Sequence, residues 1–409
     1  MNQNSIFEFR KLYNNFSKIK RGYAKLIDLY FEKHPELSNI KQYIPEKYLS
    51  ISSKVANEHL YLICANTAKI IADNVIPFVK EDQIVAESNV GLGLITTELL
   101  EKGVKRVRMY ETCPEFRVDL KSFDSAFPGR VELFTKNLFH LGRFSFLDKQ
   151  DGINRVDILL KGVPKKAWTD DPSMTVVGTM PNLNFLKYLI KSIALQTGPS
   201  VHGRMQIFGI IREFDYKILT ATPQDNLRIY QVASILYQLI LDVEKLETFS
   251  RRIFLPWERC RGNKKLKNED MVLVRMNFKK DLPVPMDKIL YLFFFLKQFY
   301  GTGNNRVIPT VEKWVPNSGL NVILPKLKHN EYYKDISIFT RFRDLTPLQI
   351  LAVFKEVINI PSFEGSPFTA MVENELIKSE TVETSLADVA LEKQIAGEVE
   401  KLNLQDEFD

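Results

Sequence analysis

The sequence predicts an α/β fold, with a doubly wound parallel sheet followed by a smaller helical domain. Between residues 46 and 280, short apolar strand patterns alternate with helical patterns of about 10–15 residues, which is typical of parallel sheets. A turn containing Gly91 and Gly93 joins one of these strands to the next helix, and an acidic residue, Glu111, follows the next strand. These features place a candidate ligand site at one edge of the sheet.

The predicted strands are short runs of β-branched and other apolar residues. They are expected at Gln83–Glu87, Arg106–Tyr110, Arg130–Thr135, Arg155–Leu160, Thr175–Thr179 and Met205–Ile211. A last pair, near Glu244–Arg251 and Met271–Phe278, is expected to close the sheet as an antiparallel hairpin. The predicted helices include Ser53–Val75, Leu94–Lys102 and Asn226–Ile240, and a helix start is expected at Thr346-Pro347.

Composition predicts a folded chain of several parts. The chain has 409 residues, 45% of them hydrophobic, which is enough for a large core. We expect a basic N-terminal arm at 1–45, an α/β domain at 46–280, a small helical domain at 281–370 and a flexible acidic tail at 371–409. The first 26 residues contain six Lys or Arg and one acid, which fits either a mitochondrial transit segment or a basic arm.

Charge is distributed unevenly along the chain. Residues 371–409 carry a net charge of −8, so with +6 for the whole chain the first 370 residues carry +14. Such a body attracts phosphate backbones, although a generally lysine-rich surface would give the same number. The most apolar run, Ile289–Leu296, is too short to span a membrane and predicts a buried helix. The cysteines and histidines match no metal-binding spacing, so no metal is expected.

The segment Glu87–Thr96 and Glu111 have the chemistry of a nucleotide site. Glycines at 91 and 93 let the backbone approach a ligand, and the following helix points its N-terminus at the same place. A carboxylate at Glu111 can accept hydrogen bonds from both hydroxyls of a ribose. The alternative is that Glu111 is only an acidic residue at the start of a helix.

These segments resemble the rRNA adenine N6-dimethyltransferase family. The stretch Trp168–Pro181 and the Pro256-Trp257 pair are similar to one group within it, mitochondrial transcription factor B of the second paralogue type. The likeness covers roughly residues 46–350. It implies a Rossmann-like methyltransferase sheet and S-adenosylmethionine as cofactor. The positions that would hold this cofactor are Ser50, Glu87, Gly91, Gly93, Glu111 and Asn137.

The sequence departs from the family where the target adenine would be held. Active members carry Asn-Leu-Pro followed by Tyr or Phe at the end of the fourth strand, whereas this chain has Thr179, Met180, Pro181 and Asn182. The amide that grips the base and the ring that stacks on it are both missing. Where the family has an acid that meets the cofactor adenine, this chain has Asn137, whose neutral amide is a weaker hydrogen-bond partner. We therefore expect methyl transfer to be weak or lost, with the cofactor contact weakened or vestigial.

A basic segment with interleaved aromatic residues, Arg251–Lys267, predicts a nucleic-acid contact. We expect it to be an exposed loop between two strands. Its candidate binding residues are Arg251, Arg252, Trp257, Arg259, Arg261, Lys264 and Lys265. The alternative is a solvated loop with the Trp257 ring packed inward.

The resemblance implies a mitochondrial transcription initiation factor, located in the matrix nucleoid, that joins the mitochondrial RNA polymerase and helps to open promoter DNA. The alternative is an S-adenosylmethionine-dependent dimethyltransferase acting on mitochondrial small-subunit rRNA. Gly91, Gly93 and Glu111 favour the enzyme, whereas Asn137, Thr179 and Asn182 oppose it. A structural RNA-binding subunit of a ribosome-assembly particle is a third class. No membrane partner is expected.

Overall fold

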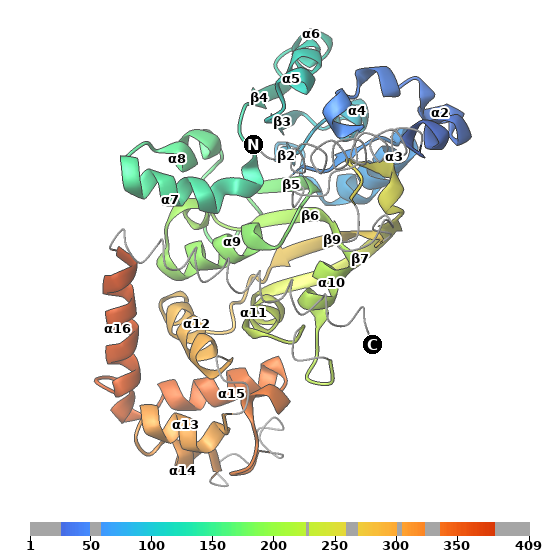
Figure 1. Cartoon of the computed structure of the whole chain (residues 1–409). Coiled ribbons are helices and arrows are strands. Elements are labelled where there is room, and N and C mark those ends of the chain that lie inside the picture. The colour runs from blue at the N-terminus through green and yellow to red at the C-terminus, as the bar shows by residue number, and fades with distance from the viewer. Residues whose placement is uncertain are drawn as a thin grey trace, which may run out of the picture.

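The computed structural model describes residues 26–49, 59–225, 229–258, 269–300, 305–323 and 336–380. Its centre is a seven-stranded sheet in the order β4-β3-β2-β5-β6-β9-β7 (Figure 1). The parallel strands are β2 (Ile84–Ser88), β3 (Arg106–Tyr110), β4 (Val131–Phe134), β5 (Met174–Thr179) and β6 (Met205–Arg212). The last two, β9 (Met271–Phe278) and β7 (Leu241–Phe249), are antiparallel. The predicted α/β class and its closing antiparallel pair are confirmed.

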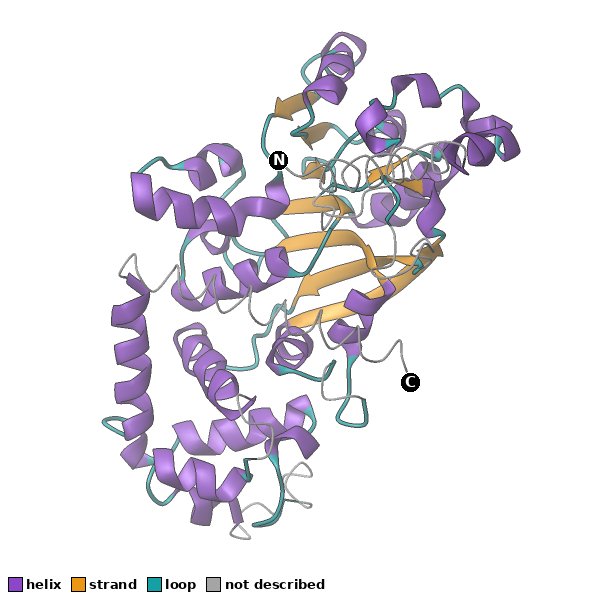
Figure 2. Cartoon of the chain, viewed as in Figure 1, coloured by secondary structure: helices purple, strands orange, loops and turns teal. Residues whose placement is uncertain are grey.

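Helices cover both faces of the sheet, because the central strands are apolar on both sides (Figure 2). Neighbouring residues of β5 face opposite ways: Val176 joins one core cluster and Val177 the other. Residues of α3 (Ala65–Val75) and α4 (Leu94–Glu101) form one cluster with the sheet. The second cluster contains residues of α7 (Leu141–Asp151), α8 (Arg155–Leu160), α9 (Asn184–Leu195) and α11 (Val232–Ile240).

Shorter helices complete the sheet domain. The pair α5 (Pro114–Leu120) and α6 (Ser122–Ala126) follows β3 and lies against the β3–β4 edge, and α10 (Glu213–Thr220) follows β6.

A second layer of helices lies in the region for which a small helical domain was predicted (Figure 1). These helices are α12 (Met286–Tyr300), α13 (Val307–Trp314), α14 (Ser318–Ile323), α15 (Pro347–Ile358) and α16 (Pro367–Glu380). Their core is continuous with that of the sheet, since Ile207 of β6 and Phe354 of α15 belong to the same buried cluster. Helix α15 begins as predicted, with the Thr346 hydroxyl accepting a hydrogen bond from the backbone of Gln349 at 3.3 Å. The predicted 370/371 boundary falls inside α16.

Part of the predicted N-terminal arm is folded. Residues 26–33 are helical and are followed by α2 (Pro35–Ser38). Ile27, Phe31 and Leu37 pack into a small core with Trp257. Close by, β1 (Tyr61–Leu62) pairs antiparallel with β8 (Phe254–Leu255). Residues 1–25 and the tail from 381 lie outside the described part of the chain.

Three predicted elements were wrong in type or extent. The expected strand Arg155–Leu160 is helix α8, and its buried residues Val156, Leu159 and Leu160 have the three- and four-residue spacing of a helix face. The helix expected from Ser53 begins only at Ala65, after the strand β1. The helix expected from Asn226 begins at Val232.

One glycine allows the two central strands to lie side by side. Gly178 in β5 pairs with Ser88 in β2 and has a φ of +148°. A Cβ atom at this position would overlap the carbonyl oxygen of Ser88. The chain therefore needs glycine where the two halves of the sheet meet.

We expect the G178A variant to lose more than about 3 kcal/mol of folding stability, because the clash involves backbone that cannot move aside. The control is G129A, where φ is +69° but no atom lies within 4 Å of the added Cβ. That variant should lose only about 1–2 kcal/mol, the cost of a left-handed backbone with a side chain. Urea unfolding followed by circular dichroism measures both values, and equal losses would contradict this account.

Candidate functional site

The candidate site lies at the carboxyl edge of the parallel strands, where the sheet order reverses between β2 and β5. The loop after β2 carries Gly91 and Gly93, Glu111 follows β3 and Asn137 follows β4. Thr179 ends β5. The structure thus brings together the predicted cofactor residues that it describes. Ser50 lies outside the described residues.

The glycine loop is built for close approach. Gly91 has a φ of +58°, and Gly93 has a φ of +73° and caps α4. A Cβ on Gly91 would lie 2.6 Å from Cδ1 of Tyr61. What lies against the loop is therefore an aromatic ring of the chain itself, supplied by β1.

Glu111 is buried and already has three donors. Its side chain is 1% exposed. One oxygen accepts from the Tyr61 hydroxyl at 3.0 Å and the Cys113 backbone at 2.7 Å, and the other from the Gly91 backbone at 2.8 Å. Burial, followed by the charge of Glu111, raises the pKa of the Tyr61 hydroxyl, so this group stays protonated and can donate.

The described arrangement does not fit S-adenosylmethionine. Ribose hydroxyls would need the carboxylate of Glu111, yet Tyr61 takes one of its bonds, and the buried Tyr61 ring, 2% exposed, lies directly against Gly91. Phe116 and Cys113 close the same cluster. A ribose can reach Glu111 only after Tyr61 has moved.

A buried amide network joins the ends of three strands. The Asn137 oxygen accepts from the Ser88 hydroxyl and the Phe139 backbone, each at 2.8 Å, and its nitrogen donates to Asn89 at 2.8 Å. Asn89 in turn donates to the carbonyl of Thr179 at 2.9 Å. The amide predicted to meet a cofactor adenine thus caps the turn after β4 and holds the loops together.

The target-base positions have structural partners. The Thr179 hydroxyl donates to the carbonyl of Leu60. Met180 is fully buried in the core, and Asn182 accepts from the backbone of Asn184 at 2.9 Å. Pro181, between them, is half-buried. No side chain of Thr179–Asn182 offers a stacking ring, and its only side-chain amide, that of Asn182, lies on the exposed surface and caps the chain at Asn184.

Glu87 is a buried carboxyl at the end of β2. Its only described hydroxyl partner is Thr96, whose hydroxyl donates to it. Burial raises the pKa of Glu87 to about 8, an effect that the Thr96 hydrogen bonds partly offset. The side chain therefore links the end of β2 to α4 through Thr96, and its raised pKa favours the protonated form near neutral pH.

The described part of the predicted basic segment is not an exposed loop, and two of its predicted contacts are wrong. The ring of Trp257 is 2% exposed and its nitrogen donates to the Arg252 carbonyl at 3.0 Å. The buried guanidinium of Arg251 donates to the carbonyls of Phe254 and Pro256 at 2.6 and 2.8 Å. The cause is the folded N-terminal segment, which covers this region. Arg252 is half-buried beside the Trp257 ring. Arg259, Arg261, Lys264 and Lys265 lie outside the described residues.

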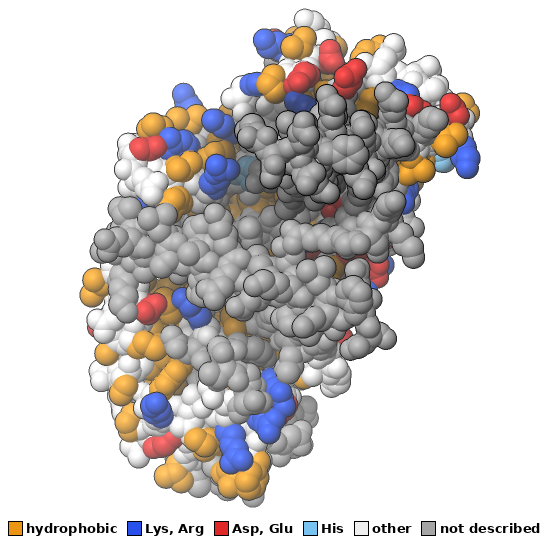
Figure 3. Space-filling view, in the orientation of Figure 1, with side chains coloured by type: hydrophobic (Ala, Val, Ile, Leu, Met, Phe, Trp, Pro, Cys, Tyr) orange, Lys and Arg blue, Asp and Glu red, His pale blue; other side chains and the backbone are white. Residues whose placement is uncertain are grey.

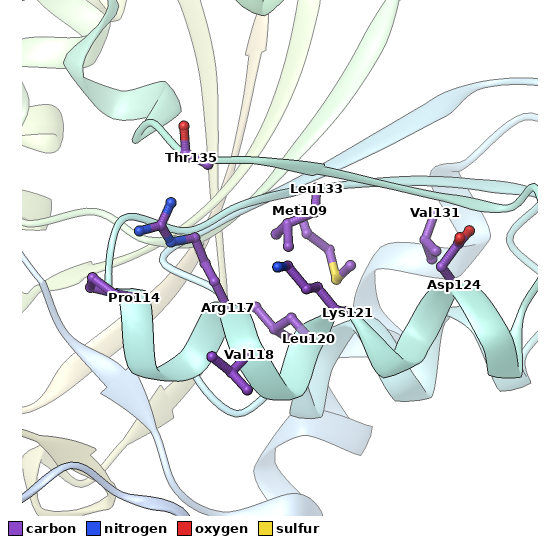
Figure 4. Close-up of a pocket in the computed structure, with 10 residues that line it drawn as sticks. All are labelled: Met109, Pro114, Arg117, Val118, Leu120, Lys121, Asp124, Val131, Leu133 and Thr135. Atoms are coloured by element: carbon purple, nitrogen blue, oxygen red, sulfur yellow. The ribbon is translucent and has the colours of Figure 1, made fainter.

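A pocket of about 690 Å³ lies next to the site but apart from the predicted cofactor residues. In Figure 4, Arg117 and Lys121 extend from the α5–α6 helices toward the strands. The residues that line this pocket are Met109, Pro114, Arg117, Val118, Leu120, Lys121, Asp124, Val131, Leu133 and Thr135. None of the predicted cofactor residues lines it.

Two residues at the site were not predicted from the sequence: Tyr61, and His59, whose Nδ1 lies 3.2 Å from the side-chain oxygen of Asn89. Tyr61 was assigned to a helix beginning at Ser53, which hid its place beside the glycine loop. The signal available was the run Tyr61–Ile63, whose β-type residues precede the true helix start at Ala65. Among the described residues, no cluster suited to a metal ion occurs and no helix is long and apolar enough to cross a membrane.

Comparisons with known proteins agree with the resemblance found in the sequence. No protein-family profile matches the chain. It is 30% identical to mitochondrial dimethyladenosine transferase 2 of Drosophila melanogaster over 82% of this chain and 84% of that protein. The Bos taurus protein of the same name is 24% identical over 68% of this chain and 71% of its own length. A crystal structure of the 23S rRNA methyltransferase ErmE is 15% identical, covers 73% of this chain and 99% of that chain, and has a TM-score of 0.47.

The buried Glu87 predicts a pH-dependent stability. Its pKa is higher in the folded chain than in the unfolded one, so its contribution is full below about pH 4.5 and is lost as the pH rises through about 8. Over that range the wild type should lose at least about 1.4 kcal/mol, the value of one pKa unit, that E87Q does not lose. Urea unfolding from pH 5 to 9 measures the difference, and parallel pH profiles would contradict it.

Proposed function

Since this chain belongs to the dimethyladenosine transferase family, we propose that it serves as a mitochondrial transcription initiation factor that helps the mitochondrial RNA polymerase to melt promoter DNA. Its methyl transfer is weak or lost. The relatives of the second type are mitochondrial proteins by name, which supports a mitochondrial location. A place in the matrix, at the nucleoid, is part of the same proposal.

The observation that carries this proposal is the state of the target-base positions. A dimethyltransferase must hold an extruded adenine by its amino group and its face. At this place the chain has Thr179 bonded to Leu60, Met180 in the core and Asn182 bonded to the backbone. A chain that keeps the fold without this grip is suited to binding nucleic acid rather than to modifying a base.

A basic surface at the carboxyl edge supports the binding role. Arg143 of α7 and Lys187 and Lys191 of α9 are exposed, and within the described part of the chain none of the three forms an ion pair. The helices touch closely, since a Cβ on Gly142 would lie 3.1 Å from Tyr188. Figure 3 shows Lys and Arg side chains over the neighbouring helices α7 and α8. The predicted cations Arg259, Arg261, Lys264 and Lys265 remain part of the proposed nucleic-acid surface.

The second candidate is the rRNA dimethyltransferase, with mitochondrial small-subunit rRNA as its partner. It is favoured by Gly91, Gly93 and Glu111, which stand at the carboxyl ends of adjacent strands as a methyl donor would need. Glu111 is, however, satisfied by donors of the chain itself.

Run-off transcription tests the proposal. With purified mitochondrial RNA polymerase and a mitochondrial promoter, transcript yield should rise at least about tenfold on adding this protein, because melted strands must be stabilised. The gain should be smaller on a template whose promoter is already mismatched open. In parallel, radiolabelled S-adenosylmethionine and a small-subunit rRNA fragment should give little or no dimethyladenosine. Dimethyladenosine without stimulation of transcription would favour the second candidate.

The basic surface gives a mutational prediction. Changing Arg143, Lys187 and Lys191 to Ala should weaken binding to melted promoter DNA and lower its dependence on the logarithm of salt by about 2–3 units, close to one per lost phosphate contact. The matched control changes Lys69, Lys280 and Lys355, three exposed lysines elsewhere on the surface that likewise form no ion pair within the described part of the chain. Fluorescence anisotropy from 50 to 300 mM salt compares them, and equal slopes for the two triple variants would place the DNA elsewhere.

A further inference from the structure

We call the glycine loop at Gly91–Gly93 together with the Glu111 carboxylate the cradle, and several contacts hold Tyr61 in it. Its backbone pairs with Leu255 in the β1–β8 sheet. Its ring lies 4.8 Å from the ring of Phe116 and 4.9 Å from that of Tyr48, both edge-on. The side chain is 2% exposed. Moving the ring out of the cradle would therefore break its packing against Phe116 and Tyr48 and its hydrogen bond to Glu111.

The N-terminal segment closes over the same place. Tyr48 stacks on Phe116 of α5 with ring centroids 5.8 Å apart, and Lys47 pairs with Glu115 at 2.9 Å. The ion pair is exposed and contributes little on its own. Together these contacts join residues 47–48 and 61 to the helix that follows Glu111.

The hydroxyl of Tyr61 does for Glu111 what a ribose hydroxyl would do. A buried carboxylate needs donors, and Glu111 obtains them from Tyr61, Gly91 and Cys113 without any ligand. The ring meanwhile fills the space that glycine at position 91 leaves open. The Glu111 carboxylate therefore has hydrogen-bond donors, and the space beside Gly91 is occupied by the Tyr61 ring.

We propose that Tyr61 is a built-in occupant of the cradle, and that its hydroxyl and ring compete with the ribose of S-adenosylmethionine for Glu111. This inference rests on the proposed loss of methyl transfer and deepens it. Through Tyr61, the cradle instead anchors the β1–β8 pair to the central sheet. Cofactor binding and this anchoring exclude each other.

The test is the affinity of the full-length protein for S-adenosylmethionine, measured by isothermal titration calorimetry. The Y61A variant removes both ring and hydroxyl and should bind the cofactor at least about tenfold more tightly than the wild type. The matched control is Y48F, which loses the neighbouring hydroxyl that lies 3.5 Å from that of Tyr61, and it should bind like the wild type. A folded Y61A that binds no more tightly than the wild type overturns the proposal.

If Y61A does not fold, Y61F decides the question, because it keeps the ring and loses only the donor. Its affinity should exceed that of Y48F by about fivefold, the equivalent of one net hydrogen bond of about 1 kcal/mol. Equal affinities overturn the proposal. Transcription assays separate this result from the proposed function. If the wild type stimulates transcription but the Tyr61 variants bind S-adenosylmethionine no more tightly, only the competition is overturned. If the Tyr61 variants bind the cofactor more tightly but the wild type does not stimulate transcription, only the transcription role is overturned.

Discussion

A carboxylate buried away from water needs hydrogen-bond donors, and at Glu111 this need brings several parts of the chain together. Its donors come from the glycine loop, from the start of α5 and from β1. Through them the N-terminal segment, the central strands and the edge helices are tied to one group. In a cofactor-dependent methyltransferase a ligand would supply part of this set, whereas here the polypeptide supplies all three donors.

The same replacement recurs around the site. Asn137 bonds to Ser88 and Asn89 rather than standing open toward an adenine, and Thr179 bonds to Leu60. Within the described residues, the side chains of Glu111, Asn137 and Thr179 thus all have partners in the chain itself. These internal hydrogen bonds satisfy buried polar groups without a ligand, which is consistent with the proposed role in binding nucleic acid.

The sheet could be predicted from the sequence and the site only in part. The strands at Arg106–Tyr110 and Met271–Phe278 were predicted to the residue, because short apolar runs between turns have few alternatives in an α/β pattern. Arg155–Leu160 failed because Val, Ile and Leu suit either structure over six residues. The role of Tyr61 depends on a contact with Glu111, 50 residues away, and local patterns carry no information about such contacts. Trp257 was placed outside for the same reason, since the segment that buries it lies more than 200 residues earlier in the chain.

The sheet and the C-terminal helices, the two lobes of the molecule, share one core, and this limits how the protein can adapt to a macromolecular partner. Buried side chains run without interruption from Ile207 in the sheet to Phe354 and Phe368 in the helical layer. Close-packed interiors deform little, so the angle between the lobes is set when the chain folds. If promoter DNA is the partner, as proposed above, the duplex would itself have to bend or unwind to fit this fixed arrangement, and the energy of that distortion would fall on the nucleic acid. Easily unstacked sequences would then be preferred even where no side chain reads a base.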